Sequence, residues 1–394
     1  MAKTRVIETA VLIVLGSTLM GCGSGPDDTE SSGQALTARP ATSTAGLSVT
    51  FVAPARPART TEERRHLLYE LVIQNTGPTA ATIVSLDAIS VGAGARSTHY
   101  AGDALAAVFV STDPQAPLGT IDAGGLGVFF LDATAPRAGD LPRGFRHALA
   151  VQRDGKTQTL PGPIVPVIDE QPVVIQPPLR GEDFLDLNGC CDGPHRRALL
   201  QFGTDLQLAQ RFAIDFAQVD LAAAQTDSDP FTHGDPTLNE SYLIFGAPIH
   251  AVAPGEVVDV RDGVAENDLT QPLPPATIES APGNYVVERF GPGRFALYAH
   301  MQTGSVRVHV GDRVAAGQVL GLVGNTGNST MPHLHFHVMD GPSPLDSDGL
   351  PYAFARFDLP GKTDLSSDNP TFEPTPPPTA RHDRLPLNGD ILSF

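Results

Sequence analysis

Hydrophobic and polar residues alternate in short runs along the first part of the chain. Turn-forming stretches such as Asn75–Pro78 and Asp122–Gly125 separate these runs. Alternation with a period of two places the apolar side chains on one face of a β-strand. The predicted strands lie at 47–52, 67–73, 81–86, 107–110 and 126–131. Many short strands at close spacing predict an immunoglobulin-like antiparallel β-sandwich over residues 46–151, which lacks a cluster of catalytic residue types.

A second set of strands follows a Pro-rich stretch, residues 152–195, which we predict to be a linker. Asn284–Phe290, the turn Gly291–Gly293 and Arg294–His300 have the pattern of a β-hairpin. We expect a second domain at 196–355 and an irregular Pro-rich tail at 356–394, which contains Pro376–Pro378. The predicted fold class is all-β, with two successive domains.

Composition and charge agree with this division. The chain has 394 residues, enough for two domains, and 41% of them are apolar. Its 39 glycines and 36 prolines favour turns and short strands over helices. The formal net charge of −18 argues against nucleic acid as a partner and is typical of a well-solvated exported protein.

The first residues predict export. Two positive charges precede an apolar stretch, Ala10–Leu15, which is too short for a stable membrane span. Leu19–Cys22 resembles the lipobox of bacterial lipoproteins, and this implies a signal peptide at 1–21, lipidation of Cys22 and a membrane anchor in the cell envelope. The alternative is an ordinary signal peptide cut near Gly21. Residues 22–45 are small and polar and read as a flexible tether.

The cysteines are the next informative residues. Lipidation of Cys22 leaves Cys190 and Cys191 of the three cysteines in the chain. Adjacent cysteines either bond to each other or remain free. A metal role together with nearby His195 is a further alternative.

The segment Pro332–Val338 (PHLHFHV) carries the strongest chemical signal. On a strand, His333, His335 and His337 share one face while the apolar residues between them face the opposite way. Neutral imidazole is the commonest metal ligand among side chains, so such a face can supply a ligand and a neighbouring base. A solvated His-rich strand face is the alternative for the triplet taken alone.

Further segments in a defined order point to one family. Tyr298–Met301 (YAHM), Val310–Gly324 (VGDRVAAGQVLGLVG) and the His-rich strand follow one another, after Gly246–Val258. This series over about 150 residues resembles the lysostaphin/LytM-type zinc metallopeptidases, which hydrolyse peptide cross-links of bacterial peptidoglycan. The resemblance implies a mostly antiparallel β domain with an open groove.

The resemblance also implies roles for individual residues. His335 matches the zinc-binding second histidine of the family's HxH motif, and Asp215 matches the carboxylate ligand of its HxxxD motif. His333 and His300 match the histidines that assist the zinc-bound water and the developing oxyanion. His337 stands where the family more often has glutamate and is expected to shape the strand end.

One family position differs. Arg211 occupies the place of the HxxxD histidine, and a guanidinium has no lone pair for a metal. We expect it to repel a cation and to form a bidentate pair with Asp215. Asp215 and His335 alone are one ligand short of the usual catalytic three, so either His195 or His233 substitutes. Otherwise the domain is a metal-free, non-catalytic wall-binding or amidase-activating module, or a store for loosely bound metal.

Overall fold

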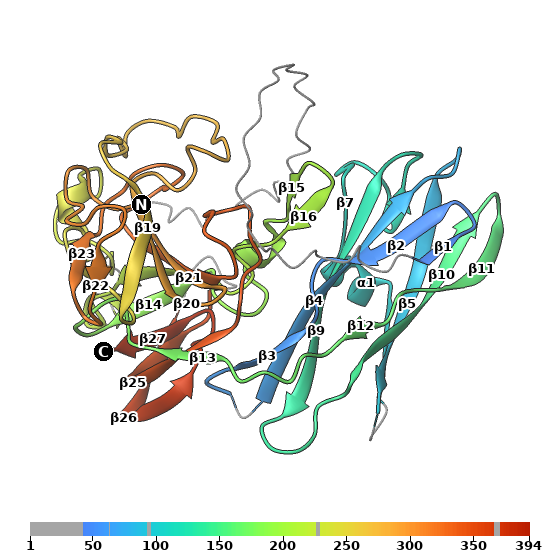
Figure 1. Cartoon of the computed structure of the whole chain (residues 1–394), viewed down its shortest axis with the longest axis horizontal. Helices are drawn as coiled ribbons and strands as arrows, with labels where there is room; N and C mark the ends of the chain where they lie inside the picture. The colour runs from blue at the N-terminus through green and yellow to red at the C-terminus, as the bar shows by residue number, and fades with distance from the viewer. Residues whose placement is uncertain (1–41, 63, 93–95, 226–228, 366–370) are drawn as a thin grey trace.

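The computed structural model describes residues 42–62, 64–92, 96–225, 229–365 and 371–394. The predicted signal peptide, Cys22 and most of the predicted tether lie outside the described residues. The fold class is confirmed, because the described chain is nearly all β and its strand pairs are antiparallel except for one pair, β13 with β25, and isolated bridges (Figure 1). None of its described helices is both long enough and apolar enough to span a membrane.

The N-terminal part is a sandwich of two sheets around a core that includes Leu71, Phe129, Leu86 and Leu149. The first sheet contains β1 (Thr42–Thr44), β2 (Leu47–Phe51), β3 (Arg56–Arg59), β4 (Arg64–Asn75), β7 (Phe109–Ser111) and β9 (Leu126–Pro136). The second contains β5 (Ala81–Val91), β6 (Ser97–Ala101), β8 (Thr120–Ile121), β10 (Gly144–Arg153), β11 (Lys156–Pro161) and β12 (Val165–Pro166).

Two details of the sandwich differ from the sequence prediction. The segment predicted as a strand at 107–110 begins inside a short helix, α1 (Asp103–Val108). The second sheet continues to Pro166, because β11 and β12 both pair with β10. The first part of the predicted linker therefore belongs to the sandwich, and its later part contributes the strands Val173–Ile175 and Phe184–Leu187 to the C-terminal sheet.

The C-terminal part is built on one large twisted sheet, the left half of Figure 1. Its strands run in the order β13-β25-β27-β14-β17-β24-β21-β20-β19-β22, with β26 paired to β25. Their bounds are β13 (Val173–Ile175), β14 (Phe184–Leu187), β17 (Ile214–Gln218), β19 (Gly255–Arg261), β20 (Tyr285–Gly291), β21 (Arg294–Ala299), β22 (Arg313–Val314), β24 (Leu334–Met339), β25 (Tyr352–Thr363), β26 (Phe372–Arg384) and β27 (Asp390–Ser393). Two small ribbons complete this part: β15 (Leu200–Phe202) with β16 (Asp205–Gln207), and β18 (Pro248–His250) with β23 (Val319–Leu322).

The prediction of an irregular tail at 356–394 is wrong. Strand β27 lies between β25 and β14 inside the large sheet, and its Ile391 and Leu392 are buried. The Pro-rich stretch lies in β26, which among the described strands pairs only with β25. Proline lacks an N–H donor but is tolerated in such an edge strand.

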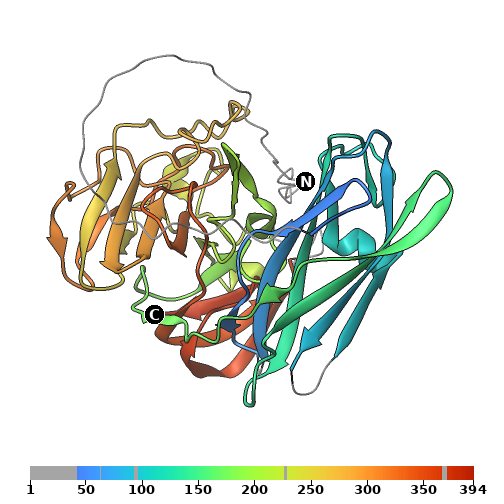
Figure 2. The same ribbon diagram turned by 45° about the vertical axis from the view of Figure 1, so that its right-hand side comes forward.

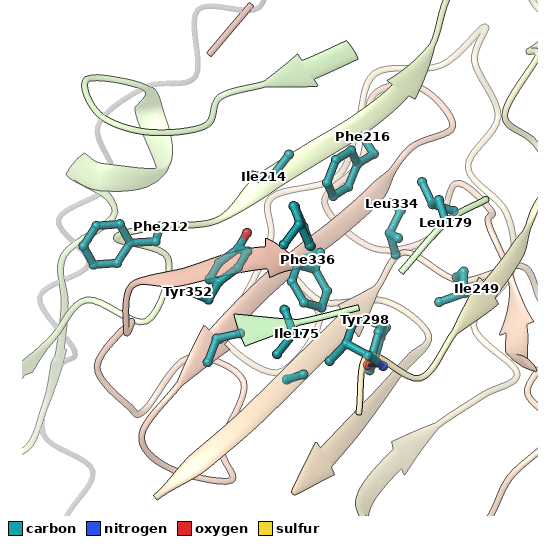
Figure 3. Packing of buried hydrophobic residues seen from close by; sticks show 14 of the residues in the cluster. Ile175, Leu179, Phe212, Ile214, Phe216, Ile249, Tyr298, Leu334, Phe336 and Tyr352 are labelled. Atoms are coloured by element: carbon teal, nitrogen blue, oxygen red, sulfur yellow. Dashed lines mark hydrogen bonds between the residues drawn. The ribbon is translucent and has the colours of Figure 1, made fainter. Parts of the chain in front are cut away.

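The core of the large sheet explains why the His-rich strand is central. Leu334, Phe336 and Val338 of β24 belong to the main hydrophobic cluster, together with Phe216 of β17 and Tyr298 of β21 (Figure 3). The intervening histidines therefore lie on the opposite face, as the alternation predicts. They are also buried, so a solvated His-rich face is wrong.

The sandwich packs directly on the large-sheet part, and Figure 2 shows the two side by side. Ala58 and Leu68 of the sandwich join the hydrophobic cluster of the large sheet. The backbone N–H of Leu385 donates to the carbonyl of Arg59 at 2.7 Å, and the N–H of Thr61 donates back to Leu385 at 3.1 Å. Apolar packing and backbone pairing thus both join the two parts.

Candidate metal centre

Three neighbouring strands bring together residues that are far apart in the chain. Asp215 of β17 lies opposite His335 of β24, and Ala299 at the end of β21 lies opposite the same histidine. His300 follows directly after β21. The sheet register therefore places a carboxylate and two imidazoles at one point of the buried face.

The carboxylate of Asp215 is the hub of this site. Its Oδ1 lies 2.8 Å from Nδ1 of His335 and 3.3 Å from Nε2 of His333. Its Oδ2 lies 3.2 Å from Nε2 of His195 and accepts a 2.8 Å hydrogen bond from the Asn188 side chain. One carboxylate thus faces three imidazoles.

Of the two candidate substitute ligands, the structure brings only His195 to the site. His195 lies on the short 3-10 helix η1 (Pro194–Arg197), and its ring lies edge-on to that of His335 with centroids 4.7 Å apart. One ligand atom each from His195, Asp215 and His335 lies within 4.8 Å of the others. His233 is exposed and pairs with Asp220 at 3.1 Å, so its side chain is engaged elsewhere.

The expected pairing of Arg211 with Asp215 is wrong. Arg211 lies in the turn before β17, and its guanidinium instead binds Glu70 of strand β4 in the sandwich. Nη2 lies 2.7 Å from Oε2 of Glu70, and Nη1 donates to the carbonyl of Gly349 at 3.1 Å. Burial opposes the guanidinium charge, but Glu70 and Asp348 stabilise it and raise the pKa of Arg211 above its usual range. The positive charge that would oppose a metal is therefore neutralised by Glu70.

The charges around Asp215 suit a cation. Burial favours the protonated acid, but His195 and His333 outweigh it and hold the pKa of Asp215 well below its ordinary value. Burial also lowers the pKa of His335, although Asp215 opposes this. An ionised Asp215 carboxylate and a neutral His335 imidazole are the protonation states that a metal requires of these two ligands.

Backbone carbonyl oxygens set the tautomers of His300 and His333. Nδ1 of His300 lies 2.7 Å from the carbonyl of Thr326, and Nδ1 of His333 lies 2.8 Å from that of Met331. A carbonyl only accepts hydrogen bonds, so each Nδ1 carries the proton when the ring is neutral and each Nε2 keeps its lone pair. The two rings lie 4.7 Å apart, and His300 has a left-handed backbone with φ of 62°. Such strain in a non-glycine residue is typical of a functional site.

His337 was not predicted as part of the site, yet it contacts a predicted ligand. Its Nδ1 lies 3.0 Å from Nε2 of His335. Burial keeps the pKa of His337 well below its ordinary value, so the ring is neutral and can accept the Nε2 proton of His335. With that bond, His335 would keep a lone pair for a metal on Nδ1, the atom that lies 2.8 Å from Oδ1 of Asp215. In the sequence, the alternation of His333, His335 and His337 is the feature that could have indicated this contact.

Two groups of side chains in the described residues contain donor types that bind metals, and the first consists of His195, Asp215 and His335. One carboxylate and two imidazoles match the ligand types and the number of protein ligands of catalytic zinc sites. A second group among the described residues contains His66, Asp132 and Cys191. The sulfur of Cys191 is bonded to Cys190 in a disulfide, so this group has no thiolate to offer. The group around Asp215 therefore fits zinc, and the second group does not.

Comparison with known proteins adds an independent observation. Residues 243–347 match the sequence profile described as Peptidase family M23. The matched segment contains His300, His333 and His335, whereas Asp215 and His195 precede it. The structure therefore brings the predicted ligand Asp215 and the candidate substitute His195, both outside the matched segment, next to the predicted ligand His335 within it.

Individual relatives are similar to only part of the chain. The glycyl-glycine endopeptidase ALE-1 of Staphylococcus capitis is 31% identical over 130 residues, which are 32% of this chain and 31% of the relative. The peptidoglycan DD-endopeptidase ShyB of Vibrio cholerae is 30% identical over 126 residues, which are 32% of this chain and 24% of the relative. The chain thus spans less than a third of the length of either relative.

Solved structures show partial likeness as well. The catalytic domain of the M23 protein EnpA from Enterococcus faecalis is 22% identical, with a TM-score of 0.25, over 43% of this chain and 88% of that one. Lysostaphin from Staphylococcus simulans is 24% identical, with a TM-score of 0.21, over 34% of this chain and 40% of that one.

Proposed function

Because residues 243–347 match the profile of Peptidase family M23, we propose that this protein is a zinc metalloendopeptidase that hydrolyses peptide cross-links of bacterial peptidoglycan. The observation that carries the proposal is the convergence of His195, Asp215 and His335, whose ligand atoms lie within 4.8 Å of one another. Three protein ligands are what a catalytic zinc site requires. The replacement of the family's histidine by Arg211 then leaves the ligand number unchanged.

The residues around the ligands have separate tasks. When bound, zinc lowers the pKa of a coordinated water to about 7 and so supplies a nucleophile at neutral pH. His333 takes a proton from the attacking water, since burial lowers its pKa but Asp215 outweighs this and raises it. His300 remains neutral, because burial holds its pKa well below the ordinary value, and its Nε2 lone pair orients the water.

The substrate class is proposed from the relatives. ALE-1 is named a glycyl-glycine endopeptidase and ShyB a peptidoglycan DD-endopeptidase, so both names describe hydrolysis of peptide bonds. Peptidoglycan lies outside the cytoplasm, where a protein with a signal peptide and a lipid at Cys22 would meet it. We propose an exported protein anchored to the membrane of the cell envelope.

The experiment combines metal analysis with an activity assay on the full mature chain. We expect one zinc per chain, release of muropeptides from purified peptidoglycan, loss of both activity and metal on chelation, and recovery of both with zinc. His335→Ala should lose metal and activity, whereas His309→Ala, whose side chain is 91% exposed, should keep both. A folded chain that takes up no zinc and releases no muropeptides would instead support the metal-free wall-binding or amidase-activating alternative.

A further inference from the structure

We propose that the N-terminal sandwich is a working part of the metal centre, with Glu70 and Arg211 as positioning residues for the metal ligands. The proposal rests on the proposed function, because it concerns the same metal. Its subject is the segment 186–211, which carries His195 and leads into Asp215. The sandwich holds this segment in place from one side.

The first contact is the buried pair Glu70–Arg211. Glu70 is 0% and Arg211 5% exposed, and the guanidinium makes three N–O contacts of 2.7 to 3.2 Å with the carboxylate. The backbone N–H of Arg211 also donates to the carbonyl of Leu208. The turn that leads into Asp215 is therefore fixed by a carboxylate of strand β4.

The second contact is made by the residues that follow His195. Arg196 is 3% exposed, and its Nη1 donates to the carbonyl of Cys191 at 3.0 Å. Glu70 and Asp132 of the sandwich stabilise its charge against burial. Arg197 donates to the carbonyl of Ala107 at 2.7 Å and lies over the ring of Phe130. Arg197 thus ties the helix of His195 to the sandwich, and Arg196 braces that helix against the disulfide loop.

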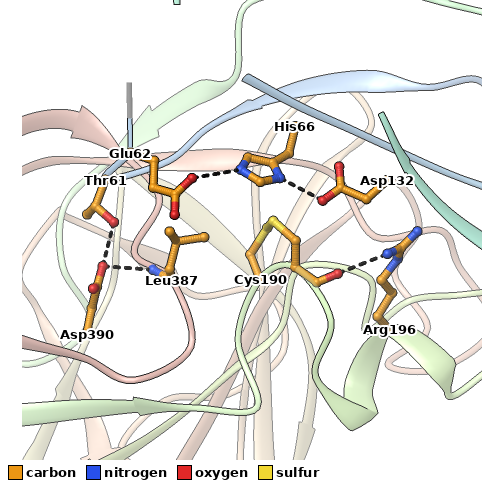
Figure 4. Close-up of a disulfide and its surroundings, with 9 residues drawn as sticks. Thr61, Glu62, His66, Asp132, Cys190, Arg196, Leu387 and Asp390 are labelled. Carbon is orange, nitrogen blue, oxygen red and sulfur yellow. Dashed lines mark hydrogen bonds and ion pairs between the residues drawn. A yellow bond between two sulfur atoms is a disulfide. The ribbon is translucent and has the colours of Figure 1, made fainter. Parts of the chain in front are cut away.

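The disulfide loop provides a third contact (Figure 4). The sulfur of Cys191 lies within 4.8 Å of a ring nitrogen of His66 and a carboxylate oxygen of Asp132. His66 and Asp132 are themselves paired at 2.8 Å across strands β4 and β9. The loop between Asn188 and His195 is therefore covered by sandwich residues.

An apolar cluster completes the interface. Val72, Val128 and Phe130 of the sandwich pack with Leu199 and Leu208 of the segment. The segment has little regular structure of its own, only the end of β14, η1 and the β15–β16 ribbon. The geometry of the segment therefore depends on the sandwich residues that cover it. Residues that support metal ligands in this way tune the affinity for the metal.

Removal of the Glu70 charge should weaken metal binding as well as lower the stability of the fold. Arg211 would remain buried without its main partner, with only the carboxylate of Asp348 at 3.6 Å among those it contacts, and Arg196 would lose one of the carboxylates that stabilise it. Relief of these charges requires the segment to move, and His195 would then move relative to Asp215 and His335. We expect zinc to bind roughly 10- to 100-fold more weakly.

The experiment measures the zinc dissociation constant of full-length Glu70→Gln by competition with a chelating dye. The visible spectrum of the cobalt-loaded protein reports ligand geometry independently of activity, and we expect it to change. A double variant, Glu70→Gln with Arg211→Met, removes both charges of the pair and should recover part of the affinity. Glu256→Gln, which breaks an exposed pair with Arg289, should bind zinc as the wild type does.

A stability control separates positioning from general destabilisation. Leu149→Ala creates a cavity in the sandwich core and should lower the melting temperature without changing zinc affinity. The proposal is overturned if Glu70→Gln binds zinc like the wild type, or if Leu149→Ala weakens zinc binding to the same extent. If His195→Ala also binds zinc normally, the ligand set of the proposed function fails instead.

Discussion

Nε2 of His195 lies 3.2 Å from Oδ2 of Asp215, while the guanidinium of Arg211 is bound to Glu70. The HxxxD motif lacks its histidine because Arg211 stands there. His195, on the 3-10 helix η1 upstream, supplies an imidazole beside Asp215 instead. In this chain the arginine binds the sandwich and the upstream histidine faces the carboxylate of Asp215.

The first prediction concerns this substitution. His195→Ala should bind zinc more than about 100-fold more weakly, because loss of a ligand exceeds the roughly 10- to 100-fold effect of a supporting residue. His233→Ala is the matched control, since His233 is exposed and pairs with Asp220. Zinc titration of both variants checks the prediction. Equal loss in the two variants, or loss in His233→Ala alone, would contradict it.

The second prediction separates binding from turnover. His333→Ala and His300→Ala should each retain zinc but lower kcat by about 10²- to 10⁴-fold, because proton transfer and orientation of water contribute effects of that size. Metal analysis and muropeptide release measured on the same samples test this. A variant that loses its zinc would make the replaced histidine a ligand.

The third prediction concerns the bond between His335 and His337. His337→Leu leaves the Nε2–H of His335 buried without an acceptor, so zinc affinity should fall by about 10- to 100-fold. His337→Glu restores an acceptor and should bind zinc within a few-fold of the wild type. If leucine and glutamate give the same affinity, His337 does not orient its neighbour.

The hairpin and the His-rich strand could be predicted from local pattern alone. The predicted strands 284–290 and 294–300 correspond to β20 (Tyr285–Gly291) and β21 (Arg294–Ala299) within one residue at each end. Their period-two alternation and the glycine turn are local features, and local features determine strand pairing across a tight turn.

The partner of Arg211 could not be predicted in this way, because the pair joins two domains. Glu70 lies in an otherwise apolar strand, Leu67–Ile73, and a charge in such a run must find a partner when the strand is buried. That signal shows that Glu70 needs a cation but not which one. Strand β26 was missed for a different reason, since its proline content suggested a loop where an edge strand tolerates proline.

The fourth prediction concerns Gly283, which lies against the backbone of Thr326, the hydrogen-bond partner of His300. Gly283 has φ of 65°, and a Cβ there would lie 2.5 Å from the carbonyl of Thr326, which accepts the Nδ1 proton of His300. Gly283→Ala should therefore displace Thr326 and lower kcat more than zinc affinity. Gly304→Ala is the control, because its φ is 71° but its Cβ would meet open space. The control should lose about 1–2 kcal/mol of stability and keep its turnover.

The fifth prediction concerns a buried carboxyl beside the hairpin. Burial raises the pKa of Glu288 from 4.5 to about 7, although the Tyr298 hydroxyl donates a hydrogen bond to it. A raised pKa means that the folded state holds the proton more tightly than the unfolded state. This contribution to stability is fully present below about pH 4.5 and is lost as the pH rises through about 7.

Glu288→Gln removes this titration and keeps an acceptor for Tyr298. The free energy of unfolding of the variant relative to the wild type should therefore rise by up to about 3 kcal/mol between pH 4.5 and pH 8. Urea unfolding of metal-free protein at several pH values measures the difference, and groups that titrate alike in both proteins cancel. Glu256→Gln, at an exposed site, should show a flat difference. A flat difference for Glu288→Gln as well would mean that Glu288 titrates alike in the folded and unfolded states.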